Sequence, residues 1–240
     1  QKLEQVKSHI TDVQEKANTL RLLLYSEDYG LLDKNLKQLE RRVIELELYS
    51  AAVEVYFCYY LLHYNDPKKR KLYQQKVEES QNNYALYSTL EIAFYEMVFQ
   101  SLDVFYHSVP KVETQLKLHL DESLNAHNKL NSNISLFFWL SSKLTIELAP
   151  KKEINPSHLS DSKRLLDLFE NSSVKYRYPG CSFAINCLTN RYHYLADNKK
   201  EFKQSLSYLS KHVSEIKGYR MYENVYFYYL YINILHLVEQ

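Results

Sequence analysis

The chain has very little that would interrupt a helix: three glycines and five prolines among 240 residues. Glycine and proline are the residues that most strongly end helices and mark turns, so we expect long helices joined by few loops. The scarcity of glycine also excludes a glycine-rich loop of the kind that cradles nucleotide phosphates. The sequence therefore predicts an all-α protein without that nucleotide-binding element.

Cysteine is scarce as well. The three cysteines, Cys58, Cys181 and Cys187, cannot all pair within one chain. The spacing between Cys181 and Cys187 suits neither a redox pair nor a zinc knuckle. We expect buried thiols, no disulfide, and a reducing, cytoplasmic setting.

A strong charge of either sign is also absent, since the formal net charge is +1 at pH 7. No global field draws the chain to nucleic acid or to an anionic membrane, and binding there would need a local patch. The densest basic run, Lys68–Lys71, is either a solvated helix end or a targeting or contact patch, and the sequence leaves this open. The longest apolar stretch, Val225–Val238, is too short to span a bilayer. We expect no membrane partner, and nucleic acid is disfavoured.

Motifs that carry catalysis or metal binding are missing. The sequence contains no His-Glu-x-x-His and no Glu-x-x-His, which excludes the usual zinc-protease and di-iron patterns. His119 and His127 lie near Asp121 and Glu122, but their spacing matches no recognised ligand set. We expect no metal, no cofactor and no catalytic residue.

A clear heptad pattern is present at the start of the chain. Apolar residues alternate at spacings of three and four from Leu3 to Leu24, and the same spacing returns from Leu32 to Tyr60. A polar turn separates the two stripes, so residues 1–64 are predicted to form a long, coiled-coil-like antiparallel hairpin. Burial of the two stripes against each other is the favoured interpretation, and a homodimer through the seam is the alternative.

Eight further helices are predicted downstream, which gives a working count of ten. Asp66 and Pro67 start the first of them as cap and first helical residue. The segment 149–156, with two prolines and a charged cluster, is the one clear linker and a point where the region 65–240 could subdivide. The predicted helices span 67–83, 84–106, 112–130, 134–148, 156–171, 181–197, 199–217 and 219–239.

Two neighbouring segments carry a family resemblance. One is Leu188–Asp197, with leucine, a small residue and then tyrosine, and the other is Ser205–His212, with the order small residue, leucine, any residue and aromatic residue. Together the two segments resemble a tetratricopeptide repeat. The resemblance covers about half the chain, and its helix starts are spaced less regularly than the family's period of roughly 34 residues. It implies antiparallel helical hairpins stacked as an α-solenoid, with a concave surface for a peptide or partner helix. A non-repetitive helical bundle is the alternative.

The 23 tyrosines point to surfaces where helices meet partners. Aromatic residues occupy every face of the last predicted helix, and only one face can meet its neighbour, so a surplus remains for binding. A composition bias of the genome is the other explanation for this enrichment. The candidate partner-binding residues are Tyr222, Tyr226, Tyr229 and Asn233 on that helix, and Tyr194 with the clamp-like Asn190 in the repeat match.

The sequence thus predicts a non-catalytic helical-repeat module that binds a protein or peptide within a larger regulatory or scaffold protein. One alternative is a ligand- or peptide-sensing regulatory domain of a transcriptional regulator whose DNA-binding segment lies outside these residues. A helical-bundle enzyme is the other.

Overall fold

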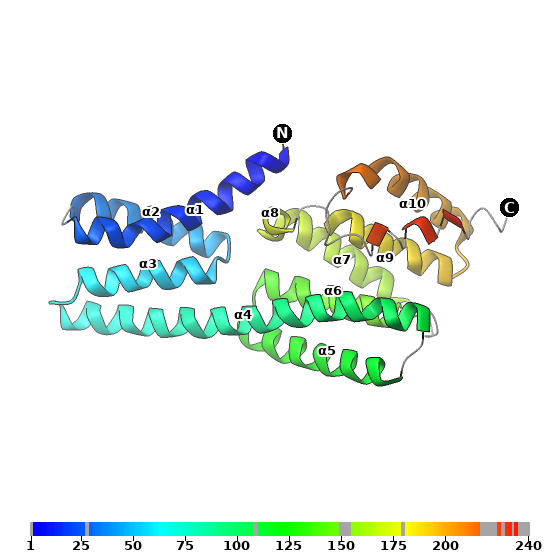
Figure 1. The fold of residues 1–240 in the computed structure, drawn as a ribbon, viewed down its shortest axis with the longest axis horizontal. Coiled ribbons are helices and arrows are strands. Elements are labelled where there is room, and N and C mark those ends of the chain that lie inside the picture. Colours follow the sequence, from blue (N-terminus) through cyan, green and yellow to red (C-terminus); the bar gives the residue numbers. More distant parts are fainter. Residues whose placement is uncertain are drawn as a thin grey trace. The chain divides into compact units, whose positions relative to one another are not determined.

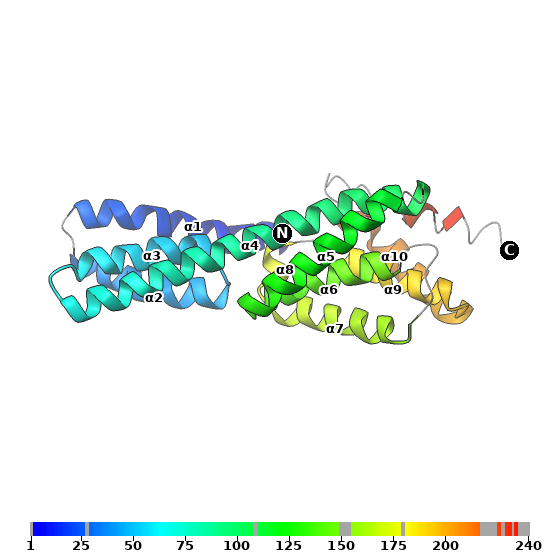
Figure 2. The same ribbon diagram turned by 90° about the horizontal axis from the view of Figure 1, so that it is seen from below.

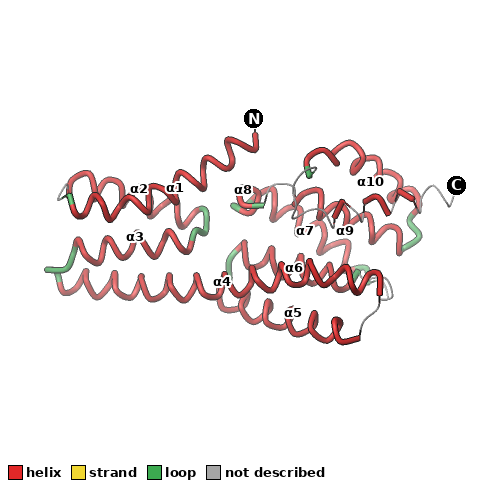
Figure 3. Tube along the Cα trace, in the orientation of Figure 1, coloured by secondary structure: helices red, strands yellow, loops and turns green. Residues whose placement is uncertain are grey.

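The computed structural model describes residues 2–26, 29–107, 110–148, 155–178 and 181–216, with residues 225, 226, 229–231, 233 and 234. Regular structure in these residues is helical, with no strand (Figure 3). The all-α class predicted from the scarcity of glycine and proline is confirmed.

Ten α-helices and one 3₁₀ turn occupy the described residues up to 216. They are α1 (Lys2–Tyr25), α2 (Tyr29–Glu45), α3 (Tyr49–Leu62), α4 (Pro67–His107), α5 (Pro110–Leu130), α6 (Asn133–Glu147), α7 (Ser157–Asn171), α8 (Val174–Arg177), α9 (Cys181–Leu195), α10 (Lys199–His212) and η1 (Val213–Glu215). The described positions between 225 and 234 are also helical. They fall in the segment predicted as the last helix, and we call them the last helix below.

The chain forms two compact units, unit 1 with residues 1–89 and unit 2 with residues 90–240. Helix α4 contributes its first part to unit 1 and its second part to unit 2. The sequence had placed boundaries elsewhere, after residue 64 and within 149–156. Figures 1 and 2 show the helices of both units in colours that follow the sequence.

Unit 1 is built around one core that α1, α2 and α3 share, each helix packing on the other two. The predicted heptad stripe supplies Val13, Ala17 and Leu20 to this core, where all three are fully buried. Tyr73 and Val77 of α4 pack against the same cluster. The described part of the α1 seam, from Ile10 to Leu24, therefore packs within the chain in this structure.

The predicted second helix is in fact two helices, which corrects the hairpin expected for residues 1–64. Helix α2 ends at Glu45, and Glu47 takes a left-handed conformation with φ 51°. The amide of Leu48 then donates to the carbonyl of Val43, a Schellman bond that closes α2 before α3 starts. A heptad pattern that continues across the turn hid this break, because core positions recur on both sides of it.

Helix α4 is a single helix where the sequence suggested two, with a junction at residues 83 and 84. No glycine or proline occurs between Pro67 and His107, so nothing local ends the helix. Its start agrees with the prediction, since the Asp66 carboxylate accepts the amides of Lys68 and Lys69 at 3.1 Å.

Unit 2 packs its helices in chain order: α5 on α6, α6 on α7, α7 on α9 and α9 on α10. Helix α6 also contacts α9, the next helix but one in this series. The core contains the fully buried Phe137, Phe138 and Phe183. Ser132 and Ser135 form a capping box at the start of α6.

The turns α2–α3 and α9–α10 have the same backbone design. Asp197 has φ 53°, like Glu47, and the amide of Asn198 donates to the carbonyl of His193 as Leu48 does to Val43. The residue before each following helix also matches, with φ −88° and ψ 78° at Leu48 and φ −84° and ψ 72° at Asn198. Each unit thus contains one hairpin closed by this three-residue turn.

Candidate functional site

The stripe predicted on the last helix turns one tyrosine inward. The Tyr229 ring packs against the cluster of Phe202 and Leu206 and meets Phe183 edge-on, with ring centroids 5.9 Å apart. Its hydroxyl donates to Ser210 Oγ at 3.0 Å. Tyr229 therefore joins the last helix to α9 and α10, and removing it would cost core packing.

The neighbours of Tyr229 in the stripe are half-buried. The Tyr226 ring lies 6.4 Å from that of Tyr229, and Asn233 Nδ2 donates to the Tyr229 carbonyl at 2.8 Å. This hydrogen bond lies within the last helix, so the Asn233 side-chain amide that the sequence assigned to a partner already donates to the backbone. Tyr222 lies outside the described residues.

An apolar surface lies one position further round the same helix. Leu230, Tyr231 and Ile234 are 38%, 42% and 59% exposed. Tyr226, Leu230 and Ile234 are spaced four residues apart and so form one stripe along a helix. We call Tyr226, Leu230, Tyr231 and Ile234 the outer stripe. Of these four residues, sequence analysis named only Tyr226, because an aromatic helix gives no signal of which face turns inward.

Asn190, the clamp-like asparagine of the repeat match, is fully buried. Its Nδ2 donates to the carbonyl of Phe202 at 3.2 Å, and its Oδ1 has no hydrogen-bond partner. Tyr194 packs on the same Phe202, with ring centroids 5.6 Å apart. In this structure both residues hold α9 to the first turns of α10.

A polar network lies where α5, α6 and α7 meet. His127 Nδ1 is 2.8 Å from Ser135 Oγ, and its ring stacks on Trp139 with centroids 5.8 Å apart. Burial, with a smaller contribution from the Arg164 charge, lowers the pKa of His127. The imidazole is therefore neutral at neutral pH, which suits stacking on the indole.

The network continues through one ion pair and one histidine–carboxylate hydrogen bond between α6 and α7. Lys143 Nζ lies 2.6 Å from Asp161 Oδ2, and His158 Nε2 lies 3.1 Å from Glu147 Oε2. Because His158 Nδ1 accepts the Asn155 amide, the imidazole proton is on Nε2 and is donated to Glu147. Lys143, Asp161 and Glu147 each have a partner, so the arrangement fixes the packing of α6 on α7.

Unit 1 contains a second cluster, of one ion pair among tyrosines. Lys76 Nζ lies 2.9 Å from Glu40 Oε1 and 4.7 Å from the centroid of Tyr56. Tyr59 and Tyr73 stack beside them with centroids 4.6 Å apart. Burial, followed by the Glu40 charge, raises the pKa values of Tyr59 and Tyr73. Although burial alone would lower it, the hydrogen bond to Glu40 raises the pKa of Lys76.

The histidines and cysteines form no metal site among the described residues. His119 Nδ1 lies 3.4 Å from Glu122 Oε2, and His127 turns to Ser135 instead. All three cysteines are buried, and none of them is in a disulfide. No helix within the described ranges has the length and apolarity needed to cross a membrane. Comparisons with protein-family models, curated proteins and solved structures found no match.

Proposed function

We propose that the chain is a non-catalytic helical-repeat module, similar to tetratricopeptide repeats, that binds a protein or peptide as part of a larger regulatory or scaffold protein. The observation that carries the proposal is the packing order in unit 2. Helix α6 contacts α7 and α9, while α9 contacts both α7 and α10. Two stacked hairpins, α6–α7 and α9–α10, would give this pattern. In such a stack each helix contacts the next one, and the first helix of one hairpin also contacts the first helix of the other.

The repeated turn supports the same interpretation. Each of the hairpins α2–α3 and α9–α10 closes with one residue in the left-handed conformation, and both turns have the same Schellman bond. Repeat proteins reuse one supersecondary unit, and such a unit keeps its turn geometry even where side chains diverge. Helix α4, with 41 residues, departs from a regular repeat.

The outer stripe is the surface that we assign to the partner. Tyrosine and large aliphatic side chains exposed to water are typical of binding surfaces, because association removes their apolar area from water. The stripe lies on a helix that α9 and α10 anchor through Tyr229. It therefore presents an apolar row on a supported helix, the arrangement by which helices recognise helices or extended peptides.

Selection from a random peptide library displayed on phage tests the proposal. We expect the purified chain to enrich a family of related peptides, and the double variant Tyr231→Ser with Ile234→Ser to lose at least about tenfold in their affinity. Leu118→Ser is the matched control, because Leu118 is an exposed leucine of α5 in the same unit. Its effect should be negligible.

Two results would count against the proposal. One is a library that yields no sequence family. The other is a selected family that binds the double variant and the parent equally, provided that both show the same unfolding curve.

A further inference from the structure

One end of unit 1 gathers most of its exposed apolar side chains. The C-terminal end of α1, the N-terminal end of α2 and the α3–α4 connection lie at the same end of the unit (Figures 1 and 2). Elsewhere among the described side chains of unit 1, only Ile44 and Tyr84 are large, apolar and exposed. We call the end surface the tip, and it comprises Leu22, Tyr25, Tyr29, Leu31, Tyr64 and Leu72 with the basic residues Lys68, Lys69, Arg70 and Lys71.

The apolar side chains of the tip are strongly exposed. Tyr25 is 77%, Leu22 67% and Tyr64 57% exposed. Single exposed leucines are ordinary, but a group drawn from two neighbouring connections is a patch, and such patches mark interaction surfaces.

The basic residues of the tip have no ion pair within the described part of the chain. Asp66, the acid beside them, accepts backbone amides of α4 instead, so the helix N-terminus is already capped and is not itself an anion site. The Arg70 guanidinium lies over the Tyr64 ring, 5.3 Å from its centroid. Two exposed cations of α2 differ in this respect, since Lys37 pairs with Asp33 and Arg41 pairs with Glu45.

The composition of the tip narrows the choice of partner. A second copy would meet it through a two-fold axis, which would set four cations against the same four cations. Nucleic acid would leave the leucines without a partner, because bases and phosphates offer stacking and charge. An anionic lipid surface suits both the basic and the apolar residues of the tip. Its headgroups attract the cations, while leucine and tyrosine enter the interfacial layer.

We propose that the tip is a peripheral contact site for anionic lipid surfaces. The near-neutral net charge had argued against a membrane partner unless a local patch existed, and the tip is such a patch. The positive charge of the tip comes from Lys68–Lys71 at the start of α4. The sequence between α1 and α2 contains the acidic Glu27 and Asp28, which lie outside the described residues. The proposal concerns unit 1 alone and does not rest on the proposed function.

Co-sedimentation of the full chain with vesicles tests the site. The parent should bind vesicles of phosphatidylcholine mixed with phosphatidylserine and release them at high salt, and it should bind pure phosphatidylcholine weakly. Each cation near such a surface is worth about 1 kcal/mol, or about fivefold in partitioning. Replacing Lys68, Lys69, Arg70 and Lys71 together by Ser should therefore abolish measurable binding.

The apolar half is tested by Leu22→Ser combined with Tyr25→Ser, which should reduce binding by about tenfold or more at unchanged salt dependence. Arg41→Ser and Ile44→Ser are controls, since they remove a paired cation and an exposed apolar residue from the C-terminal half of α2, away from the tip. Neither should change binding. Unfolding curves of all variants show whether the fold is kept. The salt dependence of binding is measured on the parent, so this test of the electrostatic contribution does not depend on the folding of a variant.

Three results would overturn the proposal. The parent could bind both kinds of vesicle equally or neither, or the basic variant could bind as the parent does. A concentration-dependent dimer that Tyr25→Ser dissolves would make the tip a self-contact instead. Displacement of the parent from vesicles by a single-stranded oligonucleotide, with tighter binding of the oligonucleotide, would assign the tip to nucleic acid.

Discussion

The two units use helices in opposite ways. In unit 1 each of α1, α2 and α3 touches the other two, so one core serves all three helices. In unit 2 helices α5 to α10 pack mainly on the next helix in the chain, so the core is a series of local interfaces. A shared core unfolds as one cooperative block, whereas a series of interfaces can loosen at one place and persist at others.

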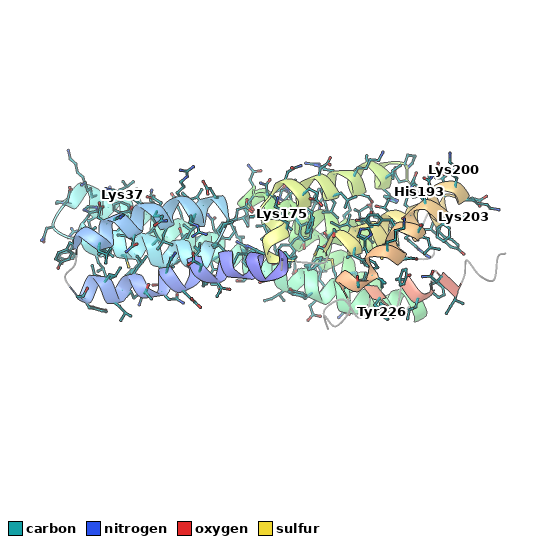
Figure 4. All side chains as sticks on the ribbon, turned by 90° about the horizontal axis from the view of Figure 1, so that it is seen from above. Lys37, Lys175, His193, Lys200, Lys203 and Tyr226 are labelled. Atoms are coloured by element: carbon teal, nitrogen blue, oxygen red, sulfur yellow. The ribbon has the colours of Figure 1, made fainter. Side chains whose placement is uncertain are left out.

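The described charges of α1 and α2 differ from those of α10. Among the described side chains, cations of α1 and α2 are largely paired across or along helices, as with Arg21 and Glu54 or Arg42 and Asp12. On α10, by contrast, Lys199, Lys200, Lys203 and Lys211 have no ion pair within the described residues. Figure 4 labels Lys37 of unit 1 and Lys200 and Lys203 of α10. Ion pairs therefore add to apolar burial in holding α1, α2 and α3 together, whereas α10 is held by burial and by the hydrogen bonds of Asn190 and Tyr229.

The largest expected effect is the loss of unit 1 on replacing Leu39 by Asp. Leu39 is 3% exposed in the core that α1, α2 and α3 share. A carboxylate buried there without a partner should cost about 4 kcal/mol or more. Because the core is common to three helices, we expect the whole unit to unfold rather than α2 alone.

Thiol labelling measures this outcome separately for each unit. Cys58 belongs to unit 1, Cys181 and Cys187 to unit 2, and burial raises the pKa of the Cys58 thiol to about 11. In Leu39→Asp we expect rapid labelling of Cys58 at neutral pH while the other two stay protected. Ile44→Asp, at a 60% exposed position of the same helix, should change stability by less than about 0.5 kcal/mol. Simultaneous labelling of all three thiols would contradict independent units.

Helix boundaries could be predicted where a local residue ends a helix. Asp66 and Pro67 mark the start of α4. Asn155 marks the start of α7, because its Oδ1 accepts a hydrogen bond from the amide of Ser157, the first residue of that helix. The break after Glu45 and the continuity of α4 through residue 83 could not be predicted in this way. In the first case tertiary packing selects a left-handed glutamate, and in the second two asparagines are tolerated inside a helix that neighbours support.

The candidate site was harder to predict than the fold. The sequence identifies the last helix as rich in aromatic residues, but its inward face depends on which residues α9 and α10 offer. Tyr229 meets Phe183 and Ser210, and this contact fixes the phase that leaves Leu230 and Ile234 outside. Asn190 matched a family position by sequence, yet the fully buried side chain holds two helices together instead.

An intermediate effect is expected for Asn190→Ala, which tests whether unit 2 loosens locally. The change removes the hydrogen bond from Asn190 to the Phe202 carbonyl and leaves a small cavity, at a cost of about 1–3 kcal/mol. Hydrogen exchange should accelerate at the amides of α9 and α10, with α5 and α6 unchanged. Asn186→Ala is the matched control, because Asn186 Nδ2 donates only to Ser182 within the same helix. Equal acceleration across unit 2 would mean that its interfaces unfold together.

The smallest expected effect separates the charges of the two units. Lys37 Nζ lies 2.6 Å from Asp33 Oδ2 one turn away, in an exposed pair of the kind worth about 0.3–0.5 kcal/mol. Lys203 on α10 has no such partner among the described residues. Both changes, Lys37→Ala and Lys203→Ala, gain the same helix propensity, so their difference in unfolding free energy isolates the ion pair. We expect Lys37→Ala to be the less stable by that amount at low salt, and the difference to vanish at high salt through screening. Denaturant unfolding gives both values when it is followed by labelling of Cys58 for unit 1 and of Cys181 and Cys187 for unit 2. A greater loss for Lys203→Ala would mean that this lysine has a carboxylate partner in solution.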